Sequence, residues 1–203
     1  MIDDSGAVEA ASILLARSID EHLLVLSDLL AEVREPFERS ANLLLEAVRN
    51  DRAIFFAGNG GSASDAMHLA AELVGRFQRE RPGLRSEALS ANPASLTAIS
   101  NDYGFAQSYS RLVQANARAG DVLVAISTSG SSVNILAAAA QARRQGVHVI
   151  GLSGAAASGL AHPMQDAVDI LLMVPSRVTA RVQEMHILLG HCWCDWIERH
   201  CVQ

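Results

Sequence analysis

The sequence contains no lysine, because all 16 basic residues among its 203 residues are arginine. Without a lysine amine, the chain cannot form a Schiff base with a sugar or with pyridoxal phosphate. It also cannot complete a Walker-type phosphate-binding loop, which requires a lysine. These absences exclude several classes of enzyme at once.

Long apolar runs and a basic net charge are also missing. No stretch approaches the roughly 20 apolar residues of a membrane span, and residues 1–4 lack the basic segment of a signal peptide. The formal net charge of -6 argues against a nucleic-acid groove. The 3 cysteines form no paired framework, which predicts buried free thiols. We therefore expect a cytoplasmic protein that binds neither nucleic acid nor a membrane.

The first quarter of the chain is predicted to form a helical arm. Apolar residues recur at helical spacing from about residue 7 to residue 50, and Pro36 interrupts the pattern. We predict two helices in an arm over residues 1–50, followed by an α/β domain over residues 51–203, in effect as a single domain. The arm is more apolar than one small sheet requires, so we expect part of it to mediate oligomerisation.

After residue 50, short apolar runs alternate with longer helical patterns. This alternation is typical of a doubly wound, flavodoxin-like α/β fold, a parallel five-stranded sheet with helices on both faces. The predicted strands cover residues 54–57, 87–89, 122–127, 147–152 and 169–174. The main predicted helices cover residues 63–77, 105–117, 133–145 and 179–200.

Two predicted strand-to-helix turns are rich in glycine and serine: GNGGS at 58–62 and STSGSS at 127–132. Glycines let backbone N–H groups approach a ligand, and a helix N-terminus adds about half a positive charge. The two turns therefore suit a phosphate monoester on a polyol; the alternative is ordinary turns with N-cap side chains. The first turn is not a dinucleotide fingerprint, because the third glycine is missing and no acidic residue ends the next strand.

The helix after the first turn carries His68 and Glu72, which lie one above the other on one face. Such a pair is half of a metal site, a catalytic acid and base, or a solvated ion pair. Gln183 and His191 on the last helix are about 80° and about 12 Å apart, so they reach one ligand only with extended side chains. A neighbouring subunit is therefore a candidate contributor to the pocket, whereas His186 is predicted to be structural.

Four segments carry a family resemblance: GNGGSASDAMHLAAELVGRF, SNDYGF, VLVAISTSGSSVNIL and TARVQEMHILLGH. Together they resemble the sedoheptulose 7-phosphate isomerases (phosphoheptose isomerases) of the sugar-isomerase (SIS) domain superfamily, over nearly the whole chain. The resemblance implies a homotetramer with active sites near subunit interfaces and a zinc ion in each subunit. It implies conversion of sedoheptulose 7-phosphate to D-glycero-D-manno-heptose 7-phosphate, the first step toward the heptoses of lipopolysaccharide and related glycans.

The resemblance also implies roles for individual residues. The substrate-binding residues would be Asn59, Gly60, Gly61, Ser62, Glu72, Arg76, Asn101, Asp102, Ser127, Thr128, Ser129, Ser132 and Gln183. Asn101 and Asp102 would belong to a second substrate loop. The phosphate cradle would consist of Ser127, Thr128, Ser129 and Ser132. The metal ligands would be His68, Glu72, Gln183 and His191. Glu72 would abstract the carbon-bound proton, and His191 would transfer the hydroxyl proton. Some members carry an acidic residue shortly before the glutamine, where this chain has RVTAR.

A second group of SIS proteins is similar to this chain. The bacterial replication-initiator-associating proteins are tetrameric adaptors that bind a protein partner, and they typically lack the glutamate and the histidine found here at Glu72 and His191. Because both residues are present, we predict an enzyme rather than an adaptor. A phosphosugar-sensing regulator is a third alternative, but it would normally include a DNA-binding module, and no helix-turn-helix segment is spare.

Overall fold

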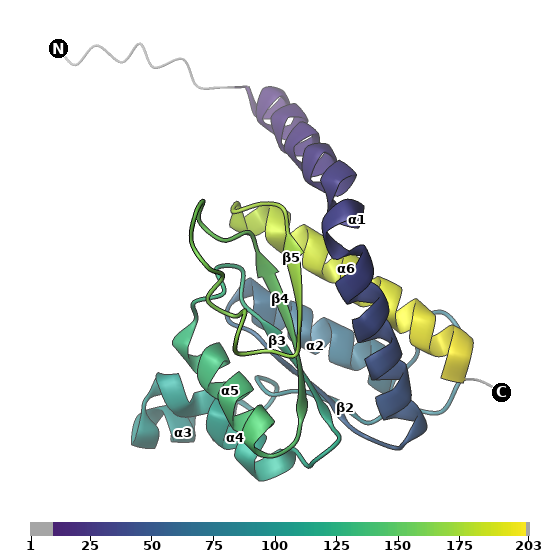
Figure 1. Ribbon diagram of the computed structural model, residues 1–203, viewed down its shortest axis with the longest axis vertical. Coiled ribbons are helices and arrows are strands. Elements are labelled where there is room, and N and C mark those ends of the chain that lie inside the picture. The colour runs from purple at the N-terminus through teal and green to yellow at the C-terminus, as the bar shows by residue number, and fades with distance from the viewer. Residues whose placement is uncertain (1–9, 202–203) are drawn as a thin grey trace.

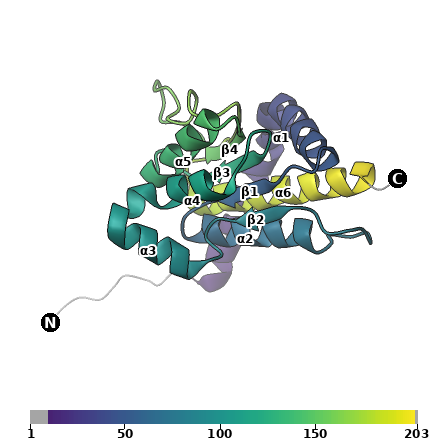
Figure 2. The same cartoon turned by 90° about the horizontal axis from the view of Figure 1, so that it is seen from below.

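The computed structural model describes residues 10–201, in which one parallel sheet lies between two layers of helices (Figures 1 and 2). The strands are β1 (Ile54–Ala57), β2 (Ser86–Ala88), β3 (Val122–Ile126), β4 (His148–Gly154) and β5 (Ile170–Val174). The helices are α1 (Ala11–Arg49), α2 (Gly61–Val74), α3 (Pro93–Tyr103), α4 (Ser108–Asn116), α5 (Val133–Arg144) and α6 (Thr179–Cys201), with a short 3-10 turn, η1 (Phe105–Gln107).

The five strands run in the order β2-β1-β3-β4-β5 and are all parallel. This is the flavodoxin-like order, and the prediction of a doubly wound sheet is confirmed. The order reverses between β1 and β3, whose last paired residues are Ala57 and Ala125. In such sheets, ligands bind beyond the carboxyl ends of the strands at the point of reversal.

The sheet separates two hydrophobic cores. Phe56 and Val124 belong to the core that packs against α1, α2 and α6, whereas Phe55 and Leu123 belong to the core beneath α4 and α5. This alternation follows from the two-residue period of a strand. All of β3 is buried, as expected for a strand with helices on both faces.

The prediction of two helices in the arm is wrong, because α1 is one continuous helix of 39 residues with Pro36 inside it. Proline removes one backbone hydrogen bond, and the carbonyl left without its donor belongs to Glu32, an exposed residue. Val33 and Ser40, on either side of Pro36, are both buried, and Ser40 accepts a hydrogen bond from the Trp193 indole N–H at 3.1 Å. Packing on both sides of Pro36 therefore keeps the helix continuous. Residues 1–9 of the predicted arm lie outside the described residues.

Other boundaries differ from the predictions in ways that affect the site. Helix α2 ends at Val74, not at residue 77, so Arg76 lies beyond the helix. Helix α3 was not predicted, although the sequence carries its start signals: the Asn92 side chain caps the Ser95 N–H at 3.1 Å, and Pro93 occupies the first turn. Asn101 and Asp102 therefore lie on the last turn of a helix and not in a loop.

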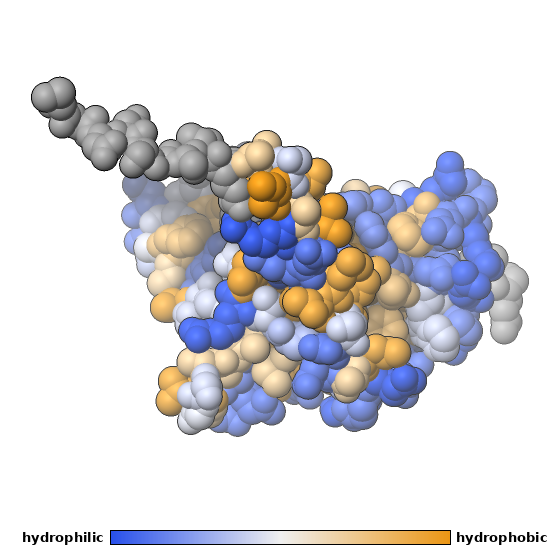
Figure 3. Space-filling model, turned by 90° about the horizontal axis from the view of Figure 1, so that it is seen from above, coloured by the Kyte–Doolittle hydropathy of each residue, from blue (hydrophilic) through white to orange (hydrophobic). Residues whose placement is uncertain are grey.

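The N-terminal half of α1 extends beyond the rest of the molecule (Figure 1) and exposes large apolar side chains, visible as orange groups in Figure 3. They are Ile13, Leu14, Leu15, Ile19, Leu23, Leu24, Leu26 and Leu30. Among residues 10–201, no helix is both long and apolar enough to cross a membrane. The three cysteines are free thiols, as predicted, but only Cys194 is buried, while Cys192 is exposed.

Candidate active site

The two glycine- and serine-rich turns lie side by side, because they follow β1 and β3, which are neighbours in the sheet. The side chains of Asn59 and Asn134 exchange two hydrogen bonds of 2.9 Å, which join the first turn to the helix after the second. The Tyr109 hydroxyl, from the buried face of α4, donates to the Gly58 carbonyl at 2.5 Å. The first turn is thus fixed from two directions.

Both turns lead directly into helices, and in α2 the N–H groups of Ser62 and Ala63 already bond the carbonyls of Asn59 and Gly60. In the described structure, no side chain caps the N-terminus of α2 or α5, so the alternative of ordinary capped turns is not supported. Gly60 has a φ of 56°, a left-handed conformation that favours glycine. In the second turn, the hydroxyl groups of Ser127 and Ser132 are 2.9 Å apart. Hydroxyl groups beside the positive end of a helix dipole suit a phosphate.

A cavity of about 340 Å³ opens beside the second turn. Its polar and charged lining comes from Thr128, Ser129, Ser131, Arg177 and Thr179, and residues 155–163 supply most of its apolar wall. Arg177 is the one charged side chain in this lining. The volume falls within the range of about 300–1,000 Å³ that is typical of small-molecule sites.

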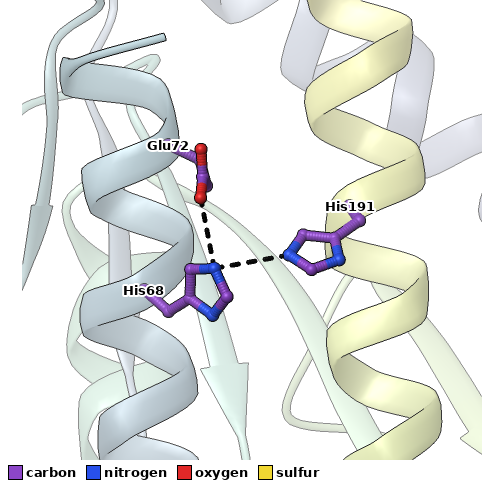
Figure 4. A group of neighbouring side chains, drawn as sticks. All are labelled: His68, Glu72 and His191. Carbon is purple, nitrogen blue, oxygen red and sulfur yellow. Dashed lines mark hydrogen bonds and ion pairs between the residues drawn. The ribbon is translucent and has the colours of Figure 1, made fainter. Parts of the chain in front are cut away.

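His68, Glu72 and His191 form a compact group between α2 and α6 (Figure 4). His68 Nε2 lies 3.2 Å from a Glu72 carboxylate oxygen and 3.4 Å from His191 Nε2. The side chains are accessible from solvent, with 46% of His68 and 24% of Glu72 exposed. The structure therefore brings together residues 123 positions apart in the sequence, as the prediction of a shared site requires.

Close packing of the two helices sets this geometry. Gly190, the residue before His191, lies against Leu69, the residue after His68, and a Cβ atom at Gly190 would come within 2.4 Å of the Leu69 side chain. The Phe77 ring stacks on the His191 ring with centroids 5.3 Å apart. His191 is thus held between Phe77 and His68.

Gln183, Asn101, Asp102 and Arg76 have other partners. Gln183 lies beside the first turn, where its amide donates to Ser62 Oγ at 3.4 Å and packs against Gly61. Asn101 donates to Asp102 at 2.9 Å, and both are exposed on α3. Arg76 is exposed, and its ion-pair partner is Glu80 at 3.9 Å and not one of the three central residues.

The three central residues fit a zinc ion. Their candidate ligand atoms all lie within 4.8 Å of one another. Ligand atoms bound tetrahedrally to zinc at about 2.0–2.1 Å lie about 3.3–3.4 Å apart, close to the separations of His68 Nε2 from the Glu72 carboxylate and from His191 Nε2. Two imidazoles and a carboxylate also form a ligand set that zinc accepts in catalytic sites, with further positions left for water or substrate.

Sequence reasoning missed several residues of the site. Asp65 lies one turn before His68; burial raises the pKa of its carboxyl above the ordinary value of 3.8, and the nearby His68 opposes the rise. Its three-residue spacing from His68 was the available signal. Ser131 and Arg177 line the cavity beside predicted residues. His186 is fully buried, and burial lowers its pKa to about 4, which agrees with a structural role.

Comparisons with known proteins identify the family of this chain. A model of the SIS domain matches residues 6–154. The phosphoheptose isomerase of Neisseria gonorrhoeae is 49% identical over 164 residues, covering 81% of this chain and 83% of that protein. A solved structure of phosphoheptose isomerase from Neisseria gonorrhoeae has a TM-score of 0.84 at 41% identity and covers 94% of this chain and 100% of that one. A phosphoheptose isomerase structure from Francisella tularensis has a TM-score of 0.87 at 32% identity, covering 94% and 99%.

The fold and the match to the domain model place the chain in the SIS domain family. Within that family it belongs to the phosphoheptose isomerases, which are enzymes of the isomerase class. The relatives do not favour the alternative of a non-enzymatic adaptor.

Proposed function

We propose that this protein isomerises D-sedoheptulose 7-phosphate to D-glycero-D-manno-heptose 7-phosphate, the first step toward the heptose precursors of lipopolysaccharide or related glycans. The observation that carries the proposal is that His68 and Glu72, on the helix that begins at the first turn, lie together with His191 of α6, with His68 3.2 Å from Glu72 and 3.4 Å from His191. Phosphoheptose isomerases at up to 49% identity support the same reaction.

The reaction moves a proton between C1 and C2 through an enediol, so it requires a base, an acid and stabilisation of the oxyanion. Glu72 abstracts the proton from carbon. His191 transfers the proton between the substrate oxygens, and its ring is held for this task by Phe77. His68 lies between the two and orients both through the contacts in Figure 4.

The phosphate is held by the second turn, where Ser127, Thr128, Ser129 and Ser132 present hydroxyl groups at the N-terminus of α5. Asn59 to Ser62 in the first turn, with Gln183 beside them, hold the sugar between the phosphate and the catalytic group, and we assign Arg76, Asn101 and Asp102 to the outer part of this pocket. Binding energy from the phosphate keeps the open-chain sugar in a reactive pose, although the phosphate takes no part in the proton transfer.

The test is conversion of sedoheptulose 7-phosphate by the purified protein, followed by NMR for the appearance of an aldose signal. We expect conversion, and in D2O we expect deuterium to appear at C2, because the base exchanges its proton with solvent. Well-folded, zinc-supplied protein that gives no aldose signal would contradict the proposal.

We further propose that His68, Glu72 and His191, together with Gln183, hold one zinc ion per subunit. A bound zinc ion would supply Lewis acidity toward the substrate oxygens. The support is the donor set and the ligand spacings described above.

We expect about one zinc per subunit in the wild-type protein after dialysis, measured by elemental analysis. His191→Ala removes one imidazole ligand and should lower the zinc affinity at least tenfold, as roughly expected when a site loses one of its ligands. His148→Asn, at an exposed position on β4, is the matched control and should keep the wild-type zinc content. Equal zinc binding by the two variants would exclude this site.

We also propose that residues 1–50 form an oligomerisation arm, that residues 51–203 form the SIS domain, and that the protein is a homotetramer. The support is the exposed apolar side of α1, together with a cavity of about 370 Å³ between α1 and α6 that Leu30, Leu188 and Cys192 help to line. Cys192 follows His191 directly, so a subunit packed on this surface would lie next to the active site.

Two charges on the apolar side of the arm should dissociate the tetramer. Leu23 and Leu30 are 54% and 58% exposed and lie seven residues apart on one face, so Leu23→Glu combined with Leu30→Glu would bury two carboxylates in the proposed interface. Light scattering should give four times 21.6 kDa for the wild-type protein and a smaller mass for the variant. Asn42→Glu, at an exposed position on α1 beyond the exposed apolar segment, is the control. A wild-type monomer would disprove the arm's role.

A further inference from the structure

His162 is a buried histidine to which the proposed mechanism gives no role. It lies in the segment between β4 and β5, and only 7% of it is exposed. The backbone N–H of Met164 donates a hydrogen bond to His162 Nδ1 at 3.1 Å. Nδ1 must therefore carry the lone pair, which places the ring hydrogen on Nε2.

The Nε2–H group of His162 points at the second turn through Ser153. It lies 3.1 Å from Ser153 Oγ and 3.2 Å from the Gly154 carbonyl oxygen. The Ser153 hydroxyl donates to the Ser127 carbonyl at 2.6 Å, so its oxygen is free to accept from His162. These three hydrogen bonds all run from donor to acceptor in the same order: from the Met164 N–H to the His162 ring, from the ring to the Ser153 hydroxyl, and from that hydroxyl to the Ser127 carbonyl.

The His162 ring also supports the second turn by direct contact. Gly130 has a φ of 70°, and a Cβ atom there would lie 2.5 Å from His162 Cε1. The Gly130 N–H donates to the same Ser127 carbonyl at 3.0 Å. The imidazole therefore packs beneath Gly130 and, through Ser153, is bonded to the oxygen that closes the turn.

We propose that His162 is a positioning residue for substrate phosphate: through Ser153 and Gly130 it holds residues 127–132 in the shape that receives the phosphate group. This inference rests on the proposed function in that the phosphate is the substrate's own. Burial lowers the pKa of His162, although its hydrogen bond to the Gly154 carbonyl opposes that shift, and the neutral ring required by the Met164 hydrogen bond is favoured.

Asparagine and glutamine at position 162 distinguish loss of the hydrogen bond to Ser153 from loss of the buried imidazole ring. Asn places its amide near the Nδ1 position and cannot reach Ser153, whereas Gln extends an amide N–H to the Nε2 position. We expect His162→Asn to raise KM for sedoheptulose 7-phosphate about tenfold, the effect of losing about one hydrogen bond, with kcat changed by less than about twofold. His162→Gln should restore most of the lost affinity, and His148→Asn should behave as the wild type.

A second measurement does not depend on the substrate. Backbone amide hydrogen exchange at residues 130 and 131 should be faster in His162→Asn and in Ser153→Ala, and close to wild type in His162→Gln. Because His162 and Ser153 act in one chain, the double variant should show no more than the larger single effect on KM.

Several outcomes would overturn the inference. These are equal KM values for the Asn and Gln variants, unchanged exchange at residues 130 and 131 in His162→Asn, or a fall in kcat without a rise in KM. A failure of the proposed function appears differently, because the wild-type protein would then give no aldose signal, while the exchange measurement would still decide whether His162 holds the turn.

Discussion

Glu72→Gln is expected to lower kcat for sedoheptulose 7-phosphate by about a hundredfold to ten-thousandfold, the contribution of a positioned general base. Glutamine keeps the size of the side chain and its contact with His68, but it cannot accept the proton from carbon. The measurement is the initial rate by NMR at saturating zinc, together with deuterium incorporation in D2O. Both signals should disappear together, because both require removal of the same proton.

Glu87→Gln is the matched control, since Glu87 is exposed on β2 and has no role in the proposed site. It should keep the wild-type rate. Zinc content measured on the same Glu72→Gln sample separates loss of the base from loss of a ligand, because a variant that retains zinc but not turnover has lost proton abstraction. Activity within about tenfold of wild type would remove Glu72 from the role of base.

The largest effect on stability is expected at Glu198, whose carboxylate is fully buried on α6. It accepts hydrogen bonds from the backbone N–H groups of Phe77, Gln78 and Arg79 at 2.6–2.9 Å, and lies 3.3 Å from Arg81. Glu198→Gln leaves the Arg81 guanidinium buried without its counter-charge. The free energy of unfolding should fall by about 3–5 kcal/mol, measured from the midpoint of urea denaturation.

The effect of Glu198 should depend on pH with a definite sign. Burial raises the pKa of its carboxyl, but the three N–H groups and Arg81 outweigh burial, so the pKa lies below its ordinary value of 4.5. A carboxylate with a lowered pKa contributes its full stability above the unfolded value and loses it as the pH falls through the folded value. The difference between wild type and Glu198→Gln should therefore be constant above about pH 5 and shrink below it.

Asp195→Asn is the control on the same helix. Asp195 bonds Arg199 at 2.7 Å across one turn, but the pair is partly exposed, at 31% and 51%. Exposed pairs contribute about 0–1 kcal/mol, so this substitution should have little effect. If Glu198→Gln and Asp195→Asn lower the free energy of unfolding by the same small amount, the buried pair of Glu198 and Arg81 does not make the predicted contribution to stability.

The sheet was predictable because most of its strands are short apolar runs bounded by turn residues. Runs such as 122–126 leave few alternatives when longer amphipathic segments lie between them. Helix α1 was mispredicted because proline normally breaks a helix, and the sequence does not show that Val33 and Ser40 would be buried on both sides of Pro36. Tertiary packing outweighed the local preference.

The candidate site was predictable only in part. Residues four apart on one helix, such as His68 and Glu72, can be paired from spacing alone. His191 joined them through the family resemblance, because its approach depends on how α2 and α6 pack. His162 and Ser153 gave no signal, since a lone histidine in a loop and a serine in a strand carry no periodicity; only the hydrogen-bond directions in the folded chain connect them to the second turn.

The contact between Gly190 and Leu69 has a consequence for how this active site tolerates change. The distance between the His68 and His191 rings depends on how closely the Gly190 backbone packs against the Leu69 side chain, and not on the histidines themselves. A methyl group added at Gly190 would clash with Leu69 and push α2 and α6 apart. It would draw the imidazoles apart while leaving every proposed catalytic and ligand group chemically intact.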